Sequence, residues 1–332
     1  MPPSRNLPGR ARQPESTTRI SARDGCEVSI VIPSYNSRAT IRACLTSVLA
    51  QETSLTHEVL LADSSDDGTD ELVRESFPTV RVLHSPERLS CGAARNAGIQ
   101  HARGKYVLLV DTDCVVGPDW VERTVAGLRE HHADGVCGSL VNGTPRSLSG
   151  TVGYFLEFFR FLGPRGKSDE TRFLLGGNSA YRRSIFGRFR FPDSSAGDDF
   201  TFSSRLSRRG AKLVFIPKIA VTHSNRTGVR RVLRYQYELG RAAARYRRES
   251  SPGIVRALTF FPPAVLLMPP VTLLRIAVRV AARCRASDVA RFLIASPAML
   301  VANYVWAFGL LAEITSRPAP SQDPALGERV GG

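Results

Sequence analysis

The 332-residue sequence predicts an α/β protein whose first half is a parallel sheet covered by helices on both faces. Between residues 27 and 113, short runs of β-branched and other apolar residues alternate with helical patterns. A hydrophobic content of 42% is enough for a large core and excludes a wholly disordered chain. Polar side chains follow three of the expected strands, at the sheet edge where open parallel sheets bind their ligands.

The first half contains four expected strands, each a short apolar run of the kind found in buried parallel sheets. They cover Val28–Pro33, Glu58–Ala62, Val80–Leu83 and Tyr106–Val110. Three helical segments should connect them. One is capped by Ser37 and runs to about Ala50, one follows the turn at 66–69, and one covers Cys91–His101.

The pattern loosens after Pro118, which suggests a second half packed on the same sheet. We expect helices over Asp119–His132 and Phe200–Arg209, and strands over Val136–Val141, Arg172–Arg182 and Lys212–His223, the last interrupted at Pro217. The aromatic run Tyr154–Leu162 is either an interfacial helix near an acceptor site or ordinary core packing.

The chain carries a net charge of +15, and most of the excess lies in residues 225–291. This stretch has 14 arginines against Glu238, Glu249 and Asp288, a net charge of +11. The arginines at 230, 234, 241, 245 and 248 share one helix face by their spacing. Nucleic acid phosphates or anionic lipid head groups could bind such a stretch.

Two apolar segments beside these arginines favour a membrane as the partner and argue against nucleic acid. Residues 257–274 are uncharged but contain four prolines, which is typical of a re-entrant or interfacial segment. Phe292–Ala312 gives 21 uncharged residues, long enough as a helix to span about 30 Å of bilayer. We expect residues 292–312 to be a transmembrane helix that anchors the preceding part of the chain, on the cytoplasmic side, to the cell (inner) membrane. Two buried core helices are the alternative.

The domain boundaries follow from these patterns. Residues 1–26 and 313–332 are expected to be loose tails, the first of them disordered and without a signal peptide. Residues 27–224 form the α/β domain, with a first half at 27–115 and a second half at 116–224. An Arg-rich helical and interfacial region occupies residues 225–291. The six cysteines show no paired spacing and indicate a reducing compartment.

Two pairs of acidic residues are the candidates for chemistry. Asp111 and Asp113 lie at i and i+2, so both carboxylates can face one site and bind Mg²⁺ or Mn²⁺. A solvated acidic turn is the alternative. Asp198 and Asp199 precede a helix, where one of them could be a general base or merely a cap.

Several co-linear motifs between residues 27 and 224 resemble those of family 2 glycosyltransferases of the GT-A fold. They are VSIVIPSYN at 28–36, EVLLAD at 58–63, ARNAG at 94–98, GKYVLLVDTD at 104–113, GGN at 176–178 and GDD at 197–199 with Arg205-Leu206. Their shared order and spacing make the resemblance more specific than any single motif.

The resemblance implies a role for each motif in sugar transfer from a nucleotide-sugar donor. It also implies that residues 27–224 are the GT-A glycosyltransferase domain, with a donor half at 27–115 and an acceptor half at 116–224. The nucleoside would be held by Pro33, Tyr35, Asn36 and Asp63, and the diphosphate would lie near Arg95. Asp111 would approach the ribose or the metal, and Asp113 would bind Mn²⁺ or Mg²⁺. The acceptor side would be lined by Gly176, Gly177 and Asn178. Asp199 would be the base of an inverting transfer. His223 would lie near the diphosphate or metal, with a purely structural histidine as the alternative.

Departures from the family pattern leave some alternatives open. The pair Asp198-Asp199 replaces the commoner Glu-Asp, so either carboxylate could be the base. The Gln-x-x-Arg-Trp signature of processive synthases is missing, which favours addition of a single sugar. The donor and acceptor that the resemblance implies are a UDP-sugar and a hydroxyl of a lipid-linked or cell-envelope glycan. A metal-dependent nucleotidyltransferase and an inactive membrane scaffold of the same fold are the competing functions.

Overall fold

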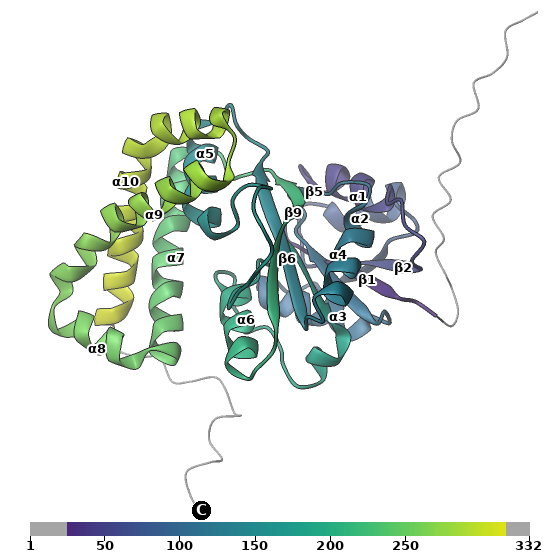
Figure 1. Ribbon diagram of the computed structural model, residues 1–332. Coiled ribbons are helices and arrows are strands. Elements are labelled where there is room, and N and C mark those ends of the chain that lie inside the picture. Colours follow the sequence, from purple (N-terminus) through teal and green to yellow (C-terminus); the bar gives the residue numbers. More distant parts are fainter. Residues whose placement is uncertain (1–24, 317–332) are drawn as a thin grey trace, which may run out of the picture.

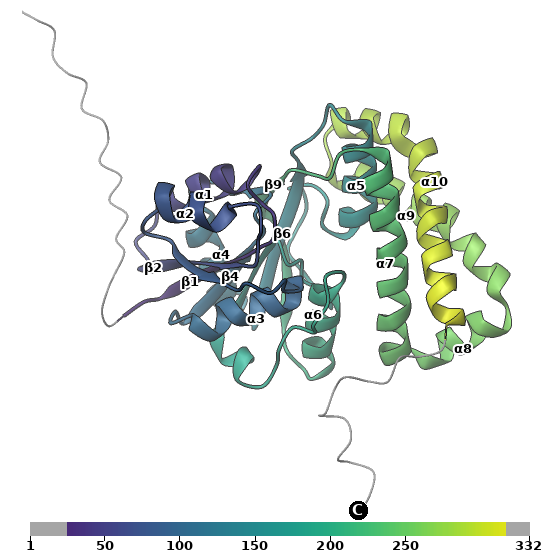
Figure 2. The same cartoon turned by 180° about the vertical axis from the view of Figure 1, so that it is seen from behind.

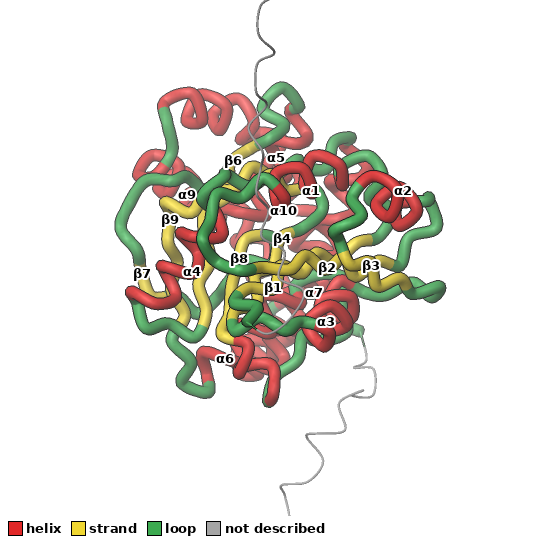
Figure 3. The backbone as a smooth tube through the Cα atoms, turned by 90° about the vertical axis from the view of Figure 1, so that its right-hand side faces the viewer, coloured by secondary structure: helices red, strands yellow, loops and turns green. Residues whose placement is uncertain are grey.

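A computed structural model describes residues 25–316 as one nine-stranded sheet with helices on both faces and a helical layer at one end (Figure 1). The strand order is β3-β2-β1-β4-β8-β6-β9-β5, and β7 pairs with β9. Helices α1 and α2 cover one face of the donor half, and α3 and α6 lie on the other (Figure 3). Most of residues 1–26 and 313–332, where we expected loose tails, lies outside the described residues.

The donor half has the expected parallel strands. These are β1 (Val28–Ser34), β2 (His57–Asp63), β3 (Arg81–His84) and β4 (Tyr106–Val110), connected by α1 (Ile41–Leu49), α2 (Thr69–Ser76) and α3 (Cys91–His101). Helix α1 begins later than expected, because the Ser37 carbonyl accepts from the Thr40 and Ile41 amides in a preceding turn. The register places Ser34 beside Asp63 at the carboxyl edge of the sheet.

The acceptor half continues the same sheet but mixes strand directions. Its elements are β5 (Cys114–Val115), α4 (Trp120–Glu130), β6 (Gly135–Asn142), α5 (Leu148–Phe158), β7 (Asp169–Glu170), β8 (Asn178–Arg182), α6 (Asp198–Arg208) and β9 (Leu213–His223), with 3-10 turns at Phe159–Phe161 and Arg183–Gly187. Strand β8 is antiparallel to both β4 and β6.

Two strand expectations in this half need correction. The strand expected over 172–182 begins only at Asn178, because residues 175–178 form a turn in which the Leu175 carbonyl accepts from the Asn178 amide. Pro217 does not divide β9, since the register shift between Gly138 and Ser139 absorbs it.

The C-terminal region is a layer of helices packed against α5 (Figure 2). It contains α7 (Val229–Ser250), α8 (Pro252–Phe260), η3 (Pro262–Leu267), α9 (Met268–Arg283) and α10 (Ala286–Thr315). The four prolines divide the apolar segment 257–274 between α8, η3 and α9. Pro262–Arg283 and Ala286–Thr315 are long and apolar enough to cross a membrane by length and composition.

Candidate active site

A cavity of about 320 Å³ lies at the carboxyl edge of the sheet, between the two halves and helix α7. It brings together nine of the thirteen site residues that the sequence predicts. They are Pro33, Tyr35, Arg95, Asp111, Asp113, Gly177, Asp198, Asp199 and His223. Residues more than 180 positions apart in the chain therefore meet at one site, because β1, β4 and β9 end near one another.

The four remaining predicted residues do not line this cavity. Asp63 is fully buried behind it, where its carboxylate accepts from the Ser65 amide at 3.0 Å and approaches His84 Nδ1 at 2.9 Å. Burial raises the pKa of Asp63, but these hydrogen bonds outweigh it and hold the pKa below its ordinary value. Asn36 accepts from the Asp66 amide, so both residues shape the loop that presents Tyr35.

On the acceptor side, the Asn178 side chain supports the sheet and does not reach the cavity. Its Nδ2 donates to the carbonyls of Ser139 and Ile219 at 3.0 and 2.8 Å, and its Oδ1 accepts from Trp120 Nε1 at 2.9 Å. Every polar atom of this buried amide is thus satisfied within the protein. Gly177 lines the cavity, and Gly176 contributes its amide to the site.

Arg95 binds two carboxylates of the protein itself. Its guanidinium donates to Asp198 through Nη1 and to Asp111 Oδ1 through Nη2, the latter at 2.8 Å. A side chain at position 176 would clash with this guanidinium, since a Cβ there would lie 2.2 Å from Nη2. Arg95 was expected near the donor diphosphate. In the structure it joins the end of β4 to the start of α6 and keeps Asp198 paired.

Asp199 is the carboxylate best suited to accept a proton. It accepts from the amides of Gly176 at 2.9 Å and Phe200 at 2.8 Å, which fixes its orientation. Burial and the neighbouring Asp198 raise the pKa of Asp199 to about 6. A base with a pKa near the working pH transfers protons efficiently, whereas Asp198 is held in an ion pair with Arg95. The geometry therefore favours Asp199 over Asp198 as the base.

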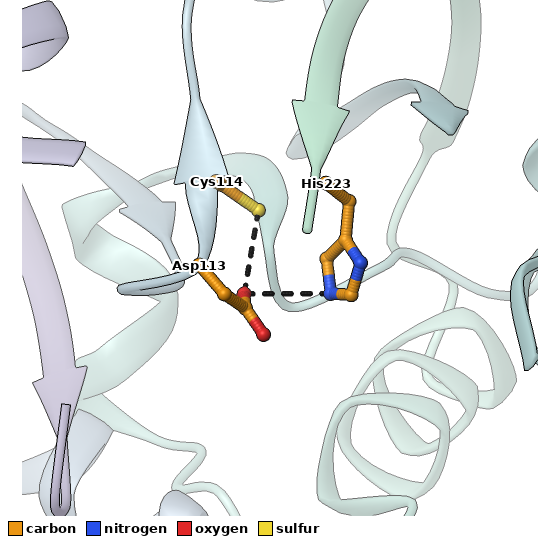
Figure 4. Close-up of side chains that lie close together, drawn as sticks. All are labelled: Asp113, Cys114 and His223. Atoms are coloured by element: carbon orange, nitrogen blue, oxygen red, sulfur yellow. Dashed lines mark hydrogen bonds and ion pairs between the residues drawn. The ribbon is translucent and has the colours of Figure 1, made fainter. Parts of the chain in front are cut away.

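Asp113 and His223 form a possible cation site (Figure 4). Strands β5 and β9 are paired so that Cys114 lies opposite His223, which brings Asp113 Oδ1 to 3.4 Å from His223 Nε2. Burial raises the pKa of Asp113, and the nearby His223 opposes this shift. Burial also raises the pKa of the Cys114 thiol well above its usual range, so the thiol stays neutral and is a weak ligand.

Asn225 fixes the orientation of the His223 imidazole. Its Nδ2 donates to Asn142 Oδ1 and Thr144 Oγ1, so its Oδ1 is left to accept from His223 Nδ1 at 3.0 Å. Nε2 then presents a lone pair toward the Asp113 carboxylate. A carboxylate oxygen and an imidazole nitrogen fit a divalent ion such as Mn²⁺. The expected third ligand, Asp111, has one oxygen occupied by Arg95.

Sequence reasoning missed several residues that line the cavity from α5, from α7 and from the loop before α7. The Arg226 guanidinium lies 3.8 Å from the centre of the Tyr235 ring and 3.4 Å from Glu157 Oε2. Burial raises the pKa of Glu157 to about 7. A lone acidic residue within the aromatic run at 154–162 was the available signal for Glu157. Arg88, which stacks on Tyr35 at 4.3 Å, was also missed.

Comparisons with known proteins agree with this geometry. The model of glycosyl transferase family 2 matches residues 29–190. Glycosyltransferase GlyG of Streptococcus pneumoniae is 24% identical over 64% of this chain and 74% of its own length. Glycosyltransferase AglE of Haloferax volcanii is 34% identical over 34% of this chain, and the match spans only 39% of AglE.

Solved structures show the same fold at low sequence identity. Mannosyltransferase PcManGT from Pyrobaculum calidifontis, in complex with GDP-Man and Mn²⁺, superposes with a TM-score of 0.54 and 21% identity. That superposition covers 87% of this chain and 84% of the other. S. aureus TarS 1–349 in complex with UDP-GlcNAc gives a TM-score of 0.51 and 17% identity, over 87% of this chain and 90% of the other. With these matches and the cavity at the sheet edge, the chain is a glycosyltransferase with a GT-A-type fold, and its residues 29–190 match glycosyl transferase family 2.

Proposed function

We propose that this glycosyltransferase inverts the anomeric carbon and moves one sugar from a nucleoside diphosphate sugar to a hydroxyl of a lipid-linked or cell-envelope glycan. The observation that carries the proposal is the position of Asp199. Its carboxylate, with a pKa of about 6, lines the same cavity as the Asp113–His223 pair. A proton acceptor and a cation site in one cavity are what such a transfer needs.

Asp199 would take the proton of the acceptor hydroxyl as that oxygen attacks the anomeric carbon. The bond between this carbon and the diphosphate oxygen breaks on the opposite face, so a single displacement inverts the configuration. Asp113 and His223 would hold a divalent ion, which supplies positive charge to offset the charge on the leaving diphosphate. Arg226 lines the cavity close to these residues and would add a second positive charge beside the phosphates.

We favour Mn²⁺ over Mg²⁺, because the site contains an imidazole nitrogen and Mg²⁺ prefers oxygen ligands. UDP-sugar is the proposed donor, with the nucleoside held against Tyr35 and Arg88. The complexes of TarS with UDP-GlcNAc and of PcManGT with GDP-Man and Mn²⁺ support a nucleotide sugar as donor and a divalent ion as cofactor. Because these two complexes contain different nucleotides, both UDP-sugars and GDP-sugars should be tested as donors.

The proposed location is the cytoplasmic face of the cell membrane. The support is the pair of apolar helices, Pro262–Arg283 and Ala286–Thr315, beside an Arg-rich stretch. An acceptor linked to lipid would then be presented at the surface where the enzyme resides.

A donor screen tests the proposal directly. UDP-, GDP- and dTDP-sugars are incubated with the full chain, and release of nucleoside diphosphate is measured with Mn²⁺ and with a chelator. We expect one donor to be turned over with Mn²⁺ and the chelator to abolish its turnover. Release of pyrophosphate would instead identify a nucleotidyltransferase, and binding of a donor without turnover in the presence of a membrane extract would indicate a scaffold.

A further inference from the structure

Helices α9 and α10 lie on the far side of the molecule from β2 (Figure 1) and carry a stripe of exposed apolar side chains. It is made of Leu274, Val278, Leu293, Ile294, Val301 and Phe308, each 55% to 72% exposed. On α10, Ile294, Val301 and Phe308 recur at intervals of seven residues, so they lie on one side of the helix, with Leu293 next to Ile294. The opposite side, with Ala295, Met299 and Ala302, is buried in the core. An exposed apolar stripe of this length is typical of an interaction surface.

Helix α10 is not free to cross a bilayer alone, because its backbone lies against that of α7. A Cβ at Gly240 would lie 2.0 Å from the Trp306 carbonyl oxygen, and one at Gly309 would lie 2.1 Å from the Tyr237 carbonyl oxygen. Glu313, near the C-terminal end of α10, forms ion pairs with Arg241 and Arg245 of α7 at 2.9 and 3.2 Å. Crossing with this packing intact would carry the arginines of α7 into hydrocarbon, which is strongly unfavourable.

Basic residues border the stripe and favour a lipid surface over a second copy of the chain. Arg275 lies next to Leu274 and one turn from Val278, and Arg285 is exposed where α9 meets α10. A symmetric dimer through this face would set the basic rims against each other, whereas anionic head groups would neutralise them. Each arginine close to an anionic bilayer surface raises the affinity about fivefold, which corresponds to about 1 kcal/mol of attraction.

We propose that the chain docks in the plane of an anionic bilayer surface through the outer stripe of α9 and α10, without crossing the bilayer. The inference rests on the membrane location proposed above, but it is independent of the transfer chemistry. Helix α10 then lies along the boundary of head groups and acyl chains, with its apolar side chains directed into the lipid. Helix α7 remains between this layer and the cavity, which Tyr235 and Leu239 line from its other side.

Depth measurements distinguish in-plane docking from crossing. Leu293→Trp, Val301→Trp and Phe308→Trp variants are bound to vesicles containing 30% anionic lipid. The lipids carry bromine, which quenches tryptophan fluorescence, either near the acyl carbonyls (shallow) or near the ends of the acyl chains (deep). The fluorescence of the parent, which contains Trp120 and Trp306, is subtracted. We expect the three probes to be quenched alike and most strongly by the shallow bromine. Strong deep quenching at position 301, with shallow quenching at 293 and 308, would mean that α10 crosses and would overturn the proposal.

Vesicle co-sedimentation tests the surface itself. We expect the double substitution Leu274→Glu and Ile294→Glu to lower vesicle affinity at least tenfold, and Arg275→Gln to lower it about fivefold. Val229→Glu is the matched control, since Val229 is 68% exposed and lies off the stripe. Equal loss in the control, or a lipid-free dimer that Ile294→Glu disperses, would refute docking to lipid. Nucleoside diphosphate release, measured in parallel without vesicles, reports separately on the proposed activity.

Discussion

Substituting Asp199 by Asn separates proton transfer from donor binding. The amide has nearly the same shape as the carboxylate, and its Oδ1 can still accept from the Phe200 amide. The Asn side chain cannot act as a base at neutral pH. Asp113 and His223, the proposed cation ligands, are untouched, as is the stacked pair of Arg88 and Tyr35. The donor should therefore bind with an affinity within about threefold of the parent.

The size of the effect follows from the role of Asp199 and from its pKa. General-base catalysis contributes about 10²–10⁴-fold, so kcat of Asp199→Asn should fall by at least a hundredfold. The base acts in its ionised form, and a pKa of about 6 makes roughly one tenth of the carboxylates ionised at pH 5 and nine tenths at pH 7. In the parent, kcat/KM should therefore rise about tenfold between pH 5 and pH 7 and then level off.

The assay combines nucleoside diphosphate release under saturating donor with calorimetric donor binding. Asp198→Asn is the matched control, because it changes the neighbouring carboxylate in the same way. It removes one partner of the buried ion pair with Arg95, so we expect it to lower the free energy of unfolding by about 3–5 kcal/mol, seen as a lower Tm.

Three results would refute the assignment of Asp199. One is a variant that retains more than a tenth of the parental kcat. Another is a parent whose activity does not change between pH 5 and pH 7. The third is an Asp198→Asn protein that stays as stable as the parent but loses turnover, since that would identify Asp198 as the base.

Other residues give further predictions. Asn225→Ala should weaken Mn²⁺ binding about 10–100-fold, measured by electron paramagnetic resonance, because His223 loses the partner that orients it; unchanged binding would mean that His223 is not a ligand. Arg226→Ala should raise the donor KM more than it lowers kcat, with partial rescue by Arg226→Lys; a loss confined to kcat would contradict a phosphate contact. Gly309→Leu should lower the free energy of unfolding by about 3 kcal/mol or more in a denaturant titration, whereas Gly253→Leu, at an open position, should change it little.

The donor half was largely predictable because its signals are local. The apolar runs of β1, β2 and β4 each identify a buried strand, and parallel strands place the residues that follow them at one edge. Tyr35, Asp111 and Asp113 reach the cavity for this reason. Helix α3 has the predicted bounds, since Ser90 supplies a side-chain cap.

The acceptor side was less predictable because distant partners decide it. Asn178 was expected to face the acceptor, yet Trp120, Ser139 and Ile219 satisfy its amide from three other elements. Arg226 and Tyr235 reach the cavity only because α7 folds back over the site, and their segment carried a membrane signal in the sequence. The position of the Arg95 guanidinium also depends on a distant partner, since Asp198 lies 103 positions further along the chain.

Strand β8 joins the donor half and the acceptor half into one continuous, rigid sheet. It is hydrogen-bonded to β4 on one side and to β6 on the other, so the sheet passes through both halves without a break. The Arg95 ion pairs cross the same boundary. Hinge bending between the two halves would break the hydrogen bonds between strands. Entry of substrates and release of products should therefore depend on movement of the loops that flank the cavity, such as 194–197 and 226–228. Exchanging these loops is therefore a practical way to alter sugar or acceptor preference while the sheet stays intact.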